Sequence, residues 1–176
     1  MSSAGRRAVL EAFRWVGPDA DIWRVFADAA TFADVIAGLC APWTDVGITH
    51  VVGIEARGFV VGAPAAVALG AGFVAVRKDA AGNLPGPTLV TTAVEDYRGI
   101  AHTMRMQEVL GPDARVLLVD DWAERGSQAE AAAALVRRAG GQFLGVSLIV
   151  DELPDDVRSR LGRVTALVTR PELGEP

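Results

Sequence analysis

The sequence predicts an α/β fold in which helices cover both faces of a parallel sheet. Apolar runs of strand length alternate with apolar stretches of helical length along the chain. The strand-length runs are apolar on consecutive residues, as expected for strands buried between two layers of helices. The chain has 176 residues, of which 51% are hydrophobic. This length and composition suit a single domain, residues 1–176, with one sizeable core.

The predicted elements have recognisable boundary signals. Apolar residues three and four apart favour a helix within residues 28–43, and Pro42 ends it. Glycines end two further helices, at Gly70 and Gly140. In chain order, we predict a helix over 28–43, a strand over 50–54, a helix over 59–69, strands over 73–76 and 115–119, a helix over 128–139, and strands over 143–150 and 164–168.

A long polar stretch separates the second predicted strand from the third. It runs from Asp79 to about Thr103 and contains several glycines and prolines. A connection of this length inside a compact domain is typical of a functional lid or a flexible hairpin.

Composition argues against several functional classes. The formal net charge is -5 and the chain has no dense run of Lys and Arg, which disfavours nucleic acid and anionic membranes as partners. No apolar run reaches about 18 residues, so no membrane span is expected. Cys40 is the only cysteine, so no intrachain disulfide is expected, which fits a reducing cytoplasm. We interpret Cys40 as a small buried residue on a helix.

Ligands of parallel α/β sheets bind beyond the carboxyl ends of the strands, and one strand end is rich in candidate chemistry. The third predicted strand is followed by Asp120 and Asp121, whose carboxylates can accept from both hydroxyls of a sugar diol. Gly126 then precedes a helix whose first N–H groups and positive dipole end suit a phosphate. Ser127 and Gln128 add side-chain donors. The alternative interpretation is a capped turn with acidic residues near a helix start.

Two other strand ends carry cations. Arg57 follows the first predicted strand and starts a helix, where a cation is unfavourable unless an anion lies nearby. Its guanidinium fork suits phosphate or pyrophosphate. Arg77 and Lys78 follow the next strand. We therefore expect a site for a diol that also carries several phosphates. A surface salt-bridge network is the less favoured alternative, because these cations cluster at strand ends.

Residues 51–59, 68–78 and 84–86 resemble adenine phosphoribosyltransferases almost residue by residue. Residues 116–121 resemble the start of the phosphoribosyl-pyrophosphate motif of the wider type I phosphoribosyltransferase family. Together, the resemblance covers roughly residues 21–153.

The resemblance implies a fold and an activity. The family fold is a parallel sheet flanked by helices, here with a small N-terminal hood and first helix in residues 1–45 and a lid over residues 79–107. The family reaction transfers a 5-phosphoribosyl group from phosphoribosyl pyrophosphate, held with Mg²⁺, to a nucleobase nitrogen and releases pyrophosphate. A purine, adenine-like acceptor is favoured, which implies purine salvage. A cytoplasmic homodimer is expected, and no residue is predicted as a metal ligand.

The resemblance also assigns residues to roles. Asp120 and Asp121 would contact the ribose hydroxyls as catalytic residues. Tyr97 would close over the substrate, and Asp96 or Glu95 would assist protonation at the base, unless this stretch is a solvated loop. Arg57 and Lys78 would bind pyrophosphate, and Gly58 and Arg77 are further implied substrate-binding residues. The residues implied for the 5-phosphate are Glu124, Arg125, Gly126, Ser127 and Gln128. His102 is either a proton carrier or simply exposed.

The chain departs from the family pattern at the phosphate turn. The family turn reads Ala-Thr-Gly-Gly-Thr, whereas this chain has Glu124-Arg125-Gly126-Ser127-Gln128. Arg125 either pairs with a phosphate or points to solvent, and Glu124 adds a negative charge that is unfavourable beside a phosphate. A second hypothesis is therefore a non-catalytic protein that binds phosphoribosyl pyrophosphate or a nucleotide. A third is a related enzyme with a different nucleophile.

The hood also resembles the family only loosely. Three aromatic residues of this segment, Trp15, Trp23 and Phe26, have two interpretations: they stack on a flat heterocycle, or they belong to the core.

Overall fold

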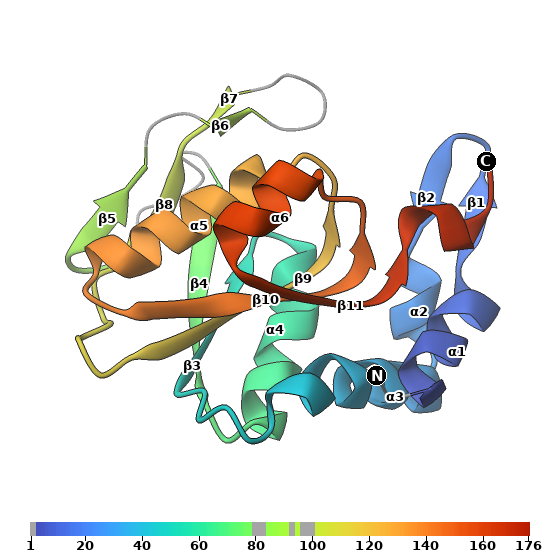
Figure 1. Cartoon of the computed structure of the whole chain (residues 1–176), viewed down its shortest axis with the longest axis horizontal. Helices are drawn as coiled ribbons and strands as arrows, with labels where there is room; N and C mark the ends of the chain where they lie inside the picture. The colour runs from blue at the N-terminus through green and yellow to red at the C-terminus, as the bar shows by residue number, and fades with distance from the viewer. Residues whose placement is uncertain (1–2, 79–83, 92–93, 96–100) are drawn as a thin grey trace.

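A seven-stranded sheet forms the centre of the computed structural model, which describes residues 3–78, 84–91, 94–95 and 101–176 (Figure 1). Its strands are β3 (His50–Ile54), β4 (Gly72–Lys78), β5 (Thr88–Val90), β8 (Met104–Gln107), β9 (Arg115–Ala123), β10 (Gln142–Asp151) and β11 (Arg163–Thr169). They lie in the order β11-β10-β9-β3-β4-β8-β5. The first five are parallel, and β8 and β5 add an antiparallel edge. This confirms the predicted α/β fold.

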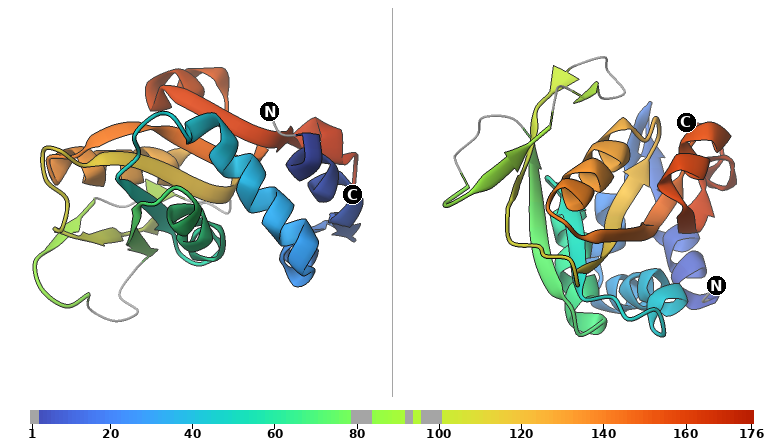
Figure 2. Two further views of the ribbon diagram at one scale, coloured as in Figure 1. Left: turned by 90° about the horizontal axis from the view of Figure 1, so that it is seen from below. Right: turned by 60° about the vertical axis from the view of Figure 1, so that its left-hand side comes forward.

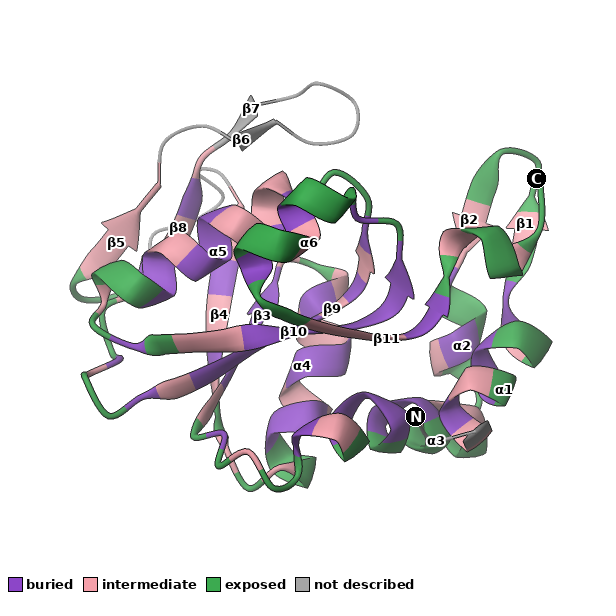
Figure 3. Ribbon diagram, viewed as in Figure 1, coloured by how far each residue is buried: buried purple, intermediate pink, exposed green. Residues whose placement is uncertain are grey.

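Helices cover both faces of the sheet (Figure 2). The helices are α1 (Ser3–Ala12), α2 (Trp23–Ala27), α3 (Ala29–Cys40), α4 (Arg57–Ala68), α5 (Ser127–Arg138) and α6 (Asp155–Leu161). On the central strand β9, Leu118 packs with residues of α5 and α6, and Leu117 packs on the opposite face with residues of α1 to α4. Both leucines are fully buried. Burial of each stabilises the fold by about 1.5–3 kcal/mol, which explains why the run over residues 116–119 of this strand is apolar on both faces (Figure 3).

An N-terminal hairpin and the C-terminal segment lie side by side near the carboxyl edge of the sheet. The short hairpin β1 (Arg14–Val16) and β2 (Asp19–Asp21) lies next to the C-terminal 3₁₀ helix η2 (Arg170–Leu173), as Figure 1 shows. The indole Nε1 of Trp15 donates to the carbonyl of Leu173 at 3.1 Å. The guanidinium of Arg170 lies 4.5 Å from the centroid of the Trp15 ring. These contacts fix the hairpin against the end of the chain.

Three features differ from the sequence prediction. The sheet is not parallel throughout, because residues of the polar stretch form β5 and β8 and extend it with an antiparallel edge. Strand β9 continues to Ala123 instead of ending at Val119, because β10 pairs with it as far as Asp151. The helices α1, α2 and α6 were not predicted. Cys40 is buried at the end of α3, as predicted.

Parts of the predicted lid, residues 79–83, 92–93 and 96–100, lie outside the described residues. The small ladder of β6 (Val94–Glu95) with β7 (Ala101–His102) is described as backbone. In the described parts of the chain, no helix has the length and apolarity that a membrane crossing requires.

Candidate active site

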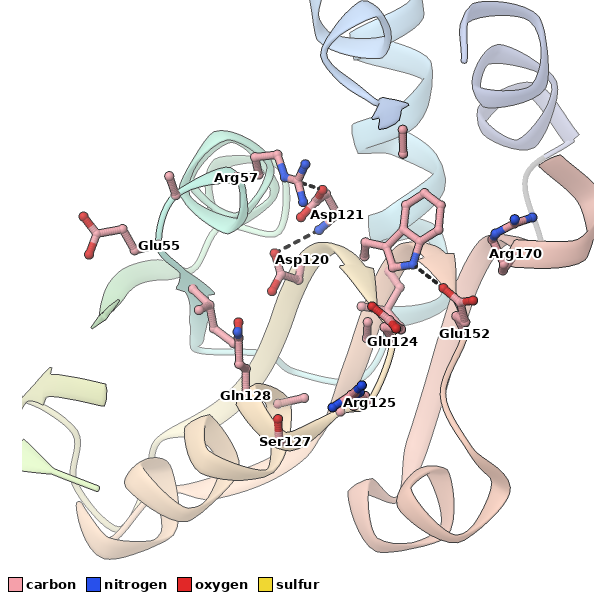
Figure 4. Close-up of a pocket in the computed structure, with 18 of the residues that line it drawn as sticks. Glu55, Arg57, Asp120, Asp121, Glu124, Arg125, Ser127, Gln128, Glu152 and Arg170 are labelled. Atoms are coloured by element: carbon pink, nitrogen blue, oxygen red, sulfur yellow. Dashed lines mark hydrogen bonds and ion pairs between the residues drawn. The ribbon is translucent and has the colours of Figure 1, made fainter. Parts of the chain in front are cut away.

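A cavity of about 650 Å³ opens at the carboxyl edge of the sheet (Figure 4). Its walls come from the ends of β3, β4, β9 and β10, the start of α5, the hood and the C-terminal segment. Most of the polar residues predicted for the site lie in it. The predicted residues that line the cavity are Arg57, Lys78, Asp120, Asp121, Glu124, Arg125, Gly126, Ser127 and Gln128.

The acidic pair lies within β9, where it is held at close quarters. Asp121 is only 4% exposed, and its Oδ2 lies 2.7 Å from Nε of Arg57. The backbone N–H of Asp121 donates to Oδ1 of Asp120 at 3.0 Å. Gly58 permits this arrangement, because a Cβ at that position would lie 2.9 Å from Oδ1 of Asp120. Gly58 therefore leaves room for the Asp120 carboxylate, and it does not itself line the cavity.

Burial dominates the ionisation of both carboxyl groups. Burial, with the neighbouring negative charge of Asp121, raises the pKa of Asp120 well above its ordinary value, although Lys78 opposes this effect. Burial also raises the pKa of Asp121, and the charge of Arg57 partly offsets it. Two neighbouring negative charges that are shielded from water are unfavourable without a ligand. The pair is therefore suited to accept hydrogen bonds from hydroxyl groups or to bind a cation.

The raised pKa of Asp120 predicts a stabilising substitution. The folded protein holds the Asp120 proton more tightly than the unfolded chain, so the free energy of unfolding falls as pH rises from the ordinary pKa of 3.8 through the raised pKa. We therefore expect Asp120→Asn to raise Tm at neutral pH by on the order of 2–4 °C, the shift that about 1 kcal/mol gives in a domain of this size. The gain should vanish as pH falls below 3.8.

Thermal unfolding followed across this pH range tests the expectation. The exposed Asp113 supplies the matched control, since Asp113→Asn should leave Tm unchanged. An Asp120→Asn protein that is less stable than wild type at neutral pH would contradict a buried, costly charge.

The cations predicted beside the acidic pair are only partly brought into the cavity. Arg57 begins α4 as predicted, and Lys78 ends β4; both line the cavity. Arg77, although described, does not line it and pairs instead with Glu55, with Nη2 to Oε1 at 3.2 Å. Oε2 of Glu55 also accepts from the backbone N–H of Lys78 at 3.1 Å. Arg77 thus anchors the ends of β3 and β4 to each other.

The divergent turn has a well-defined backbone. Gly126 has a φ of +73° and is the N-cap of α5, whose first residues line the cavity. A Cβ at Gly126 would lie 2.4 Å from Cγ1 of Val157 and 2.7 Å from Cδ2 of Leu153. Helix α6 therefore supports the turn from behind. Glu124 and Arg125 are exposed at its front.

Several residues that line the cavity were missed at the level of sequence. Trp122, Glu152 and Arg170 reach it from three separate segments. Trp122 adjoins the acidic pair in sequence, and that adjacency was the one available signal. Pairing of β10 with β9 brings Glu152 to the cavity, and packing of the C-terminal segment against the hood brings Arg170 there. Neither contact produces a local pattern in the sequence.

The remaining predicted residues fall into two groups. Asp96 and Tyr97 lie outside the described residues, and of Glu95 and His102 only the backbone is described. Among the hood aromatics, Trp15 and Trp23 line the cavity. Phe26 packs between Trp23 and Phe32, with ring centroids 5.8 and 5.5 Å away, so it belongs to an aromatic cluster of the hood.

The fold and this site define the class of the protein. A parallel sheet that carries an acidic pair, facing cations and a glycine turn before a helix at its carboxyl edge is the architecture of a type I phosphoribosyltransferase. Comparison with known proteins then gives the family: the chain belongs to the adenine phosphoribosyltransferases. No family model matches the chain.

Sequence relatives and solved structures agree on this family. The chain is 41% identical over 131 residues to the adenine phosphoribosyltransferase of Streptomyces avermitilis, covering 74% of this chain and 70% of that protein. It is 42% identical over 151 residues to that of Myxococcus xanthus, covering 85% and 80%. The crystal structure of the Rhodothermus marinus enzyme superposes with a TM-score of 0.81 at 32% identity, covering 94% and 98% of the two chains. That of the Giardia lamblia enzyme complexed with 9-deazaadenine gives 0.83 at 30% identity, covering 97% and 98%.

Proposed function

We propose that this chain transfers a 5-phosphoribosyl group from phosphoribosyl pyrophosphate to adenine and releases pyrophosphate, as a step of purine salvage. One observation carries the proposal. The Asp120–Asp121 pair, the cations Arg57 and Lys78, and the turn before α5 share one cavity of about 650 Å³. Membership of the adenine phosphoribosyltransferase family supports adenine as the acceptor.

Each group in the cavity suits one part of the donor. The Asp120 and Asp121 carboxylates accept hydrogen bonds from the ribose 2- and 3-hydroxyls. Arg57 and Lys78 bind the pyrophosphate, whose negative charge grows as the bond between C1 and the pyrophosphate oxygen breaks. A nitrogen of the base forms the new bond to C1 as the bond to pyrophosphate breaks, and the base gives up its ring N–H proton to the solvent. Because the sugar is cationic in the transition state, the adjacent carboxylates stabilise it, and the cations stabilise the leaving group.

The phosphate turn uses different side chains from the family turn. The N–H groups at the start of α5, together with Ser127 and Gln128, are directed at the 5-phosphate. Arg125 replaces a neutral threonine with a cation, which compensates for the negative charge that Glu124 brings to the same turn. We propose that the turn still binds phosphate, through charge where the family turn relies on hydroxyl groups.

Magnesium fits this site as a partner of the donor. Mg²⁺ commonly binds through one or two carboxylates together with substrate phosphates, and the Asp120–Asp121 pair supplies that number. Among the described residues, no group of three or more His, Cys, Asp and Glu side chains is placed to hold a metal. The ion would neutralise charge on the departing pyrophosphate.

Other parts of the proposal follow from the family resemblance. Residues 1–45 would cover the base and residues 79–107 would act as the lid, with Tyr97 closing over the substrate and Asp96 assisting protonation at the base. We also propose a homodimer in the cytoplasm.

A pyrophosphate-release assay tests the activity. We expect release from phosphoribosyl pyrophosphate that depends on both Mg²⁺ and adenine, with AMP formed in equal amount. Background hydrolysis is measured without the base. If neither adenine nor any other purine or pyrimidine supports release, the proposed transfer is wrong.

A second candidate function is a non-catalytic binding protein, which the Glu124–Arg125 substitution of the turn favours. In that case Arg125→Thr should tighten binding of phosphoribosyl pyrophosphate, measured by calorimetry, without producing pyrophosphate. A wild-type protein that turns over excludes this candidate.

A further inference from the structure

Two residues that line the cavity, Trp122 and Glu152, have no role in the binding of phosphoribosyl pyrophosphate proposed above. The indole Nε1 of Trp122 donates to Oε2 of Glu152 at 2.9 Å (Figure 4). Both residues line the cavity, and Glu152 lies beside Arg170, away from Gln128 at the start of α5. Trp122 directly follows the acidic pair in β9, so this contact adjoins the two residues to which we assign the ribose.

The Glu152 carboxylate is held by strand pairing. Trp122 pairs with Val150, and Ala123 pairs with Asp151, in the parallel register of β9 with β10. One residue further on, the backbone N–H of Glu152 donates to the carbonyl of Ala123 at 3.0 Å. The Glu152 side chain is therefore fixed at both its backbone and its carboxylate, although the residue is exposed.

An aromatic wall fixes Trp122 in turn. Its ring centroid lies 6.2 Å from that of Trp15 and 6.3 Å from that of Phe13. Trp15 is itself held by Arg170 over its ring and by its hydrogen bond to Leu173. The indole can therefore serve as a rigid surface on which a flat ring packs.

The Trp122–Glu152 pair offers the cavity hydrogen-bond acceptors but no donor. Trp122 has a single N–H, which donates to Glu152. The indole therefore offers a bound base only the face of its ring. An ionised carboxylate accepts hydrogen bonds and donates none, and one bond from Trp122 leaves further lone pairs of Glu152 open toward the cavity. A group with N–H donors is attracted there, and a carbonyl oxygen is repelled.

Resting on the function proposed above, we propose that Glu152, positioned by Trp122, selects the acceptor: a flat heterocycle with an exocyclic amino group is accepted in preference to its oxo counterpart. Adenine and hypoxanthine are the matched probes, since they differ by an amino group and an oxo group at one ring position. Glu152 is thus a specificity-determining residue, and Trp122 is its positioning residue.

Glu152→Gln tests the selection because it should reverse the polarity of the contact. The amide oxygen of the new side chain keeps the bond from Trp122, which turns the amide NH₂ toward the cavity. We expect the ratio of kcat/KM for adenine to kcat/KM for hypoxanthine to fall by about tenfold or more, the effect of exchanging an attractive for a repulsive polar contact at a partly exposed site. The change should fall on the KM for the base, with the KM for phosphoribosyl pyrophosphate unchanged.

Two further variants sharpen the result. Trp122→Phe keeps a ring but removes the N–H that orients Glu152, so it should lower the same ratio by a smaller factor. Glu108→Gln removes an exposed carboxylate that does not line the cavity, and it should leave the ratio unchanged.

Equilibrium binding separates this inference from the proposed function. Quenching of tryptophan fluorescence by adenine and by hypoxanthine, with phosphoribosyl pyrophosphate omitted and then present, needs no turnover. Wild-type protein that prefers adenine in binding, with the preference lost in Glu152→Gln, supports the inference even if no pyrophosphate is released. An adenine preference that survives Glu152→Gln overturns it, as does a wild type that binds neither base or both equally, even if transfer to some other acceptor is found.

Discussion

Replacing Asp120 and Asp121 together by asparagine should lower kcat/KM for phosphoribosyl transfer by about a hundredfold or more while leaving the fold intact. The two carboxylates would lose charge-assisted hydrogen bonds to the ribose and the charge that stabilises a cationic sugar. Hydrogen bonds to charged groups contribute about 1.5–3 kcal/mol each, so two lost bonds correspond to a fall of about 10²–10⁴-fold in kcat/KM. Calorimetric titration with phosphoribosyl pyrophosphate and Mg²⁺ should show binding to wild type and none to the double variant.

The single variants and the fold provide the controls. Asparagine has the shape of aspartate, and Asp120→Asn is expected to stabilise the protein. We therefore expect the variant to stay folded, so that a loss of donor binding reports on the site. Asp121→Asn also removes the partner of Arg57, whose Nε lies 2.7 Å from Oδ2, and should therefore weaken pyrophosphate binding as well. If the double variant retains donor affinity within about threefold, the ribose does not bind at this pair.

Gly126→Ala should have the largest effect on stability of any variant considered. The position requires a φ of +73°, which costs a residue with a Cβ about 1–2 kcal/mol. The new methyl would also lie 2.4 Å from Val157 and 2.7 Å from Leu153, and overpacking of this kind costs about 1–3 kcal/mol. We expect the free energy of unfolding, measured by urea denaturation, to fall by about 3 kcal/mol.

Gly70 supplies a control that separates the two costs. Its φ is +65°, but a Cβ there would meet no atom within 4 Å. Gly70→Ala should therefore show the backbone cost of about 1–2 kcal/mol and leave donor binding unchanged. Equal losses from the two glycine variants would mean that α6 does not support the turn.

The core of the fold was predictable because its signals are local. The strand over 50–54 was predicted with the bounds that β3 has, since an apolar run and an abrupt polar break define it. The three large helices were predicted to within a few residues of α3, α4 and α5 for the same reason. The antiparallel edge was not, because β5 is a three-residue strand that depends on pairing with β8 for its conformation.

The residues of the candidate site also divide into those with a local sequence signal and those that depend on long-range contacts. In the sequence, Asp120, Asp121, Arg57 and Lys78 come at or just after the ends of apolar runs of strand length, so their shared edge could be inferred from topology. Arg77 was placed at the same edge, but alternation along β4 gives it a different neighbour, and it pairs with Glu55. Glu152 and Arg170 reach the cavity through contacts between segments remote in sequence, and such contacts leave no periodic signal.

The wall formed by Trp15, Trp122, Glu152 and Arg170 comes mostly from segments that supply no group to the donor. Trp15 lies in the hood, Glu152 follows β10 and Arg170 lies in the C-terminal segment, whereas Trp122 shares β9 with the acidic pair assigned to the donor. The protein is therefore a suitable starting point for directed evolution. A library that varies only these four wall positions can be screened for enzymes that make unnatural nucleotides. The residues assigned to phosphoribosyl pyrophosphate stay as they are in such a library.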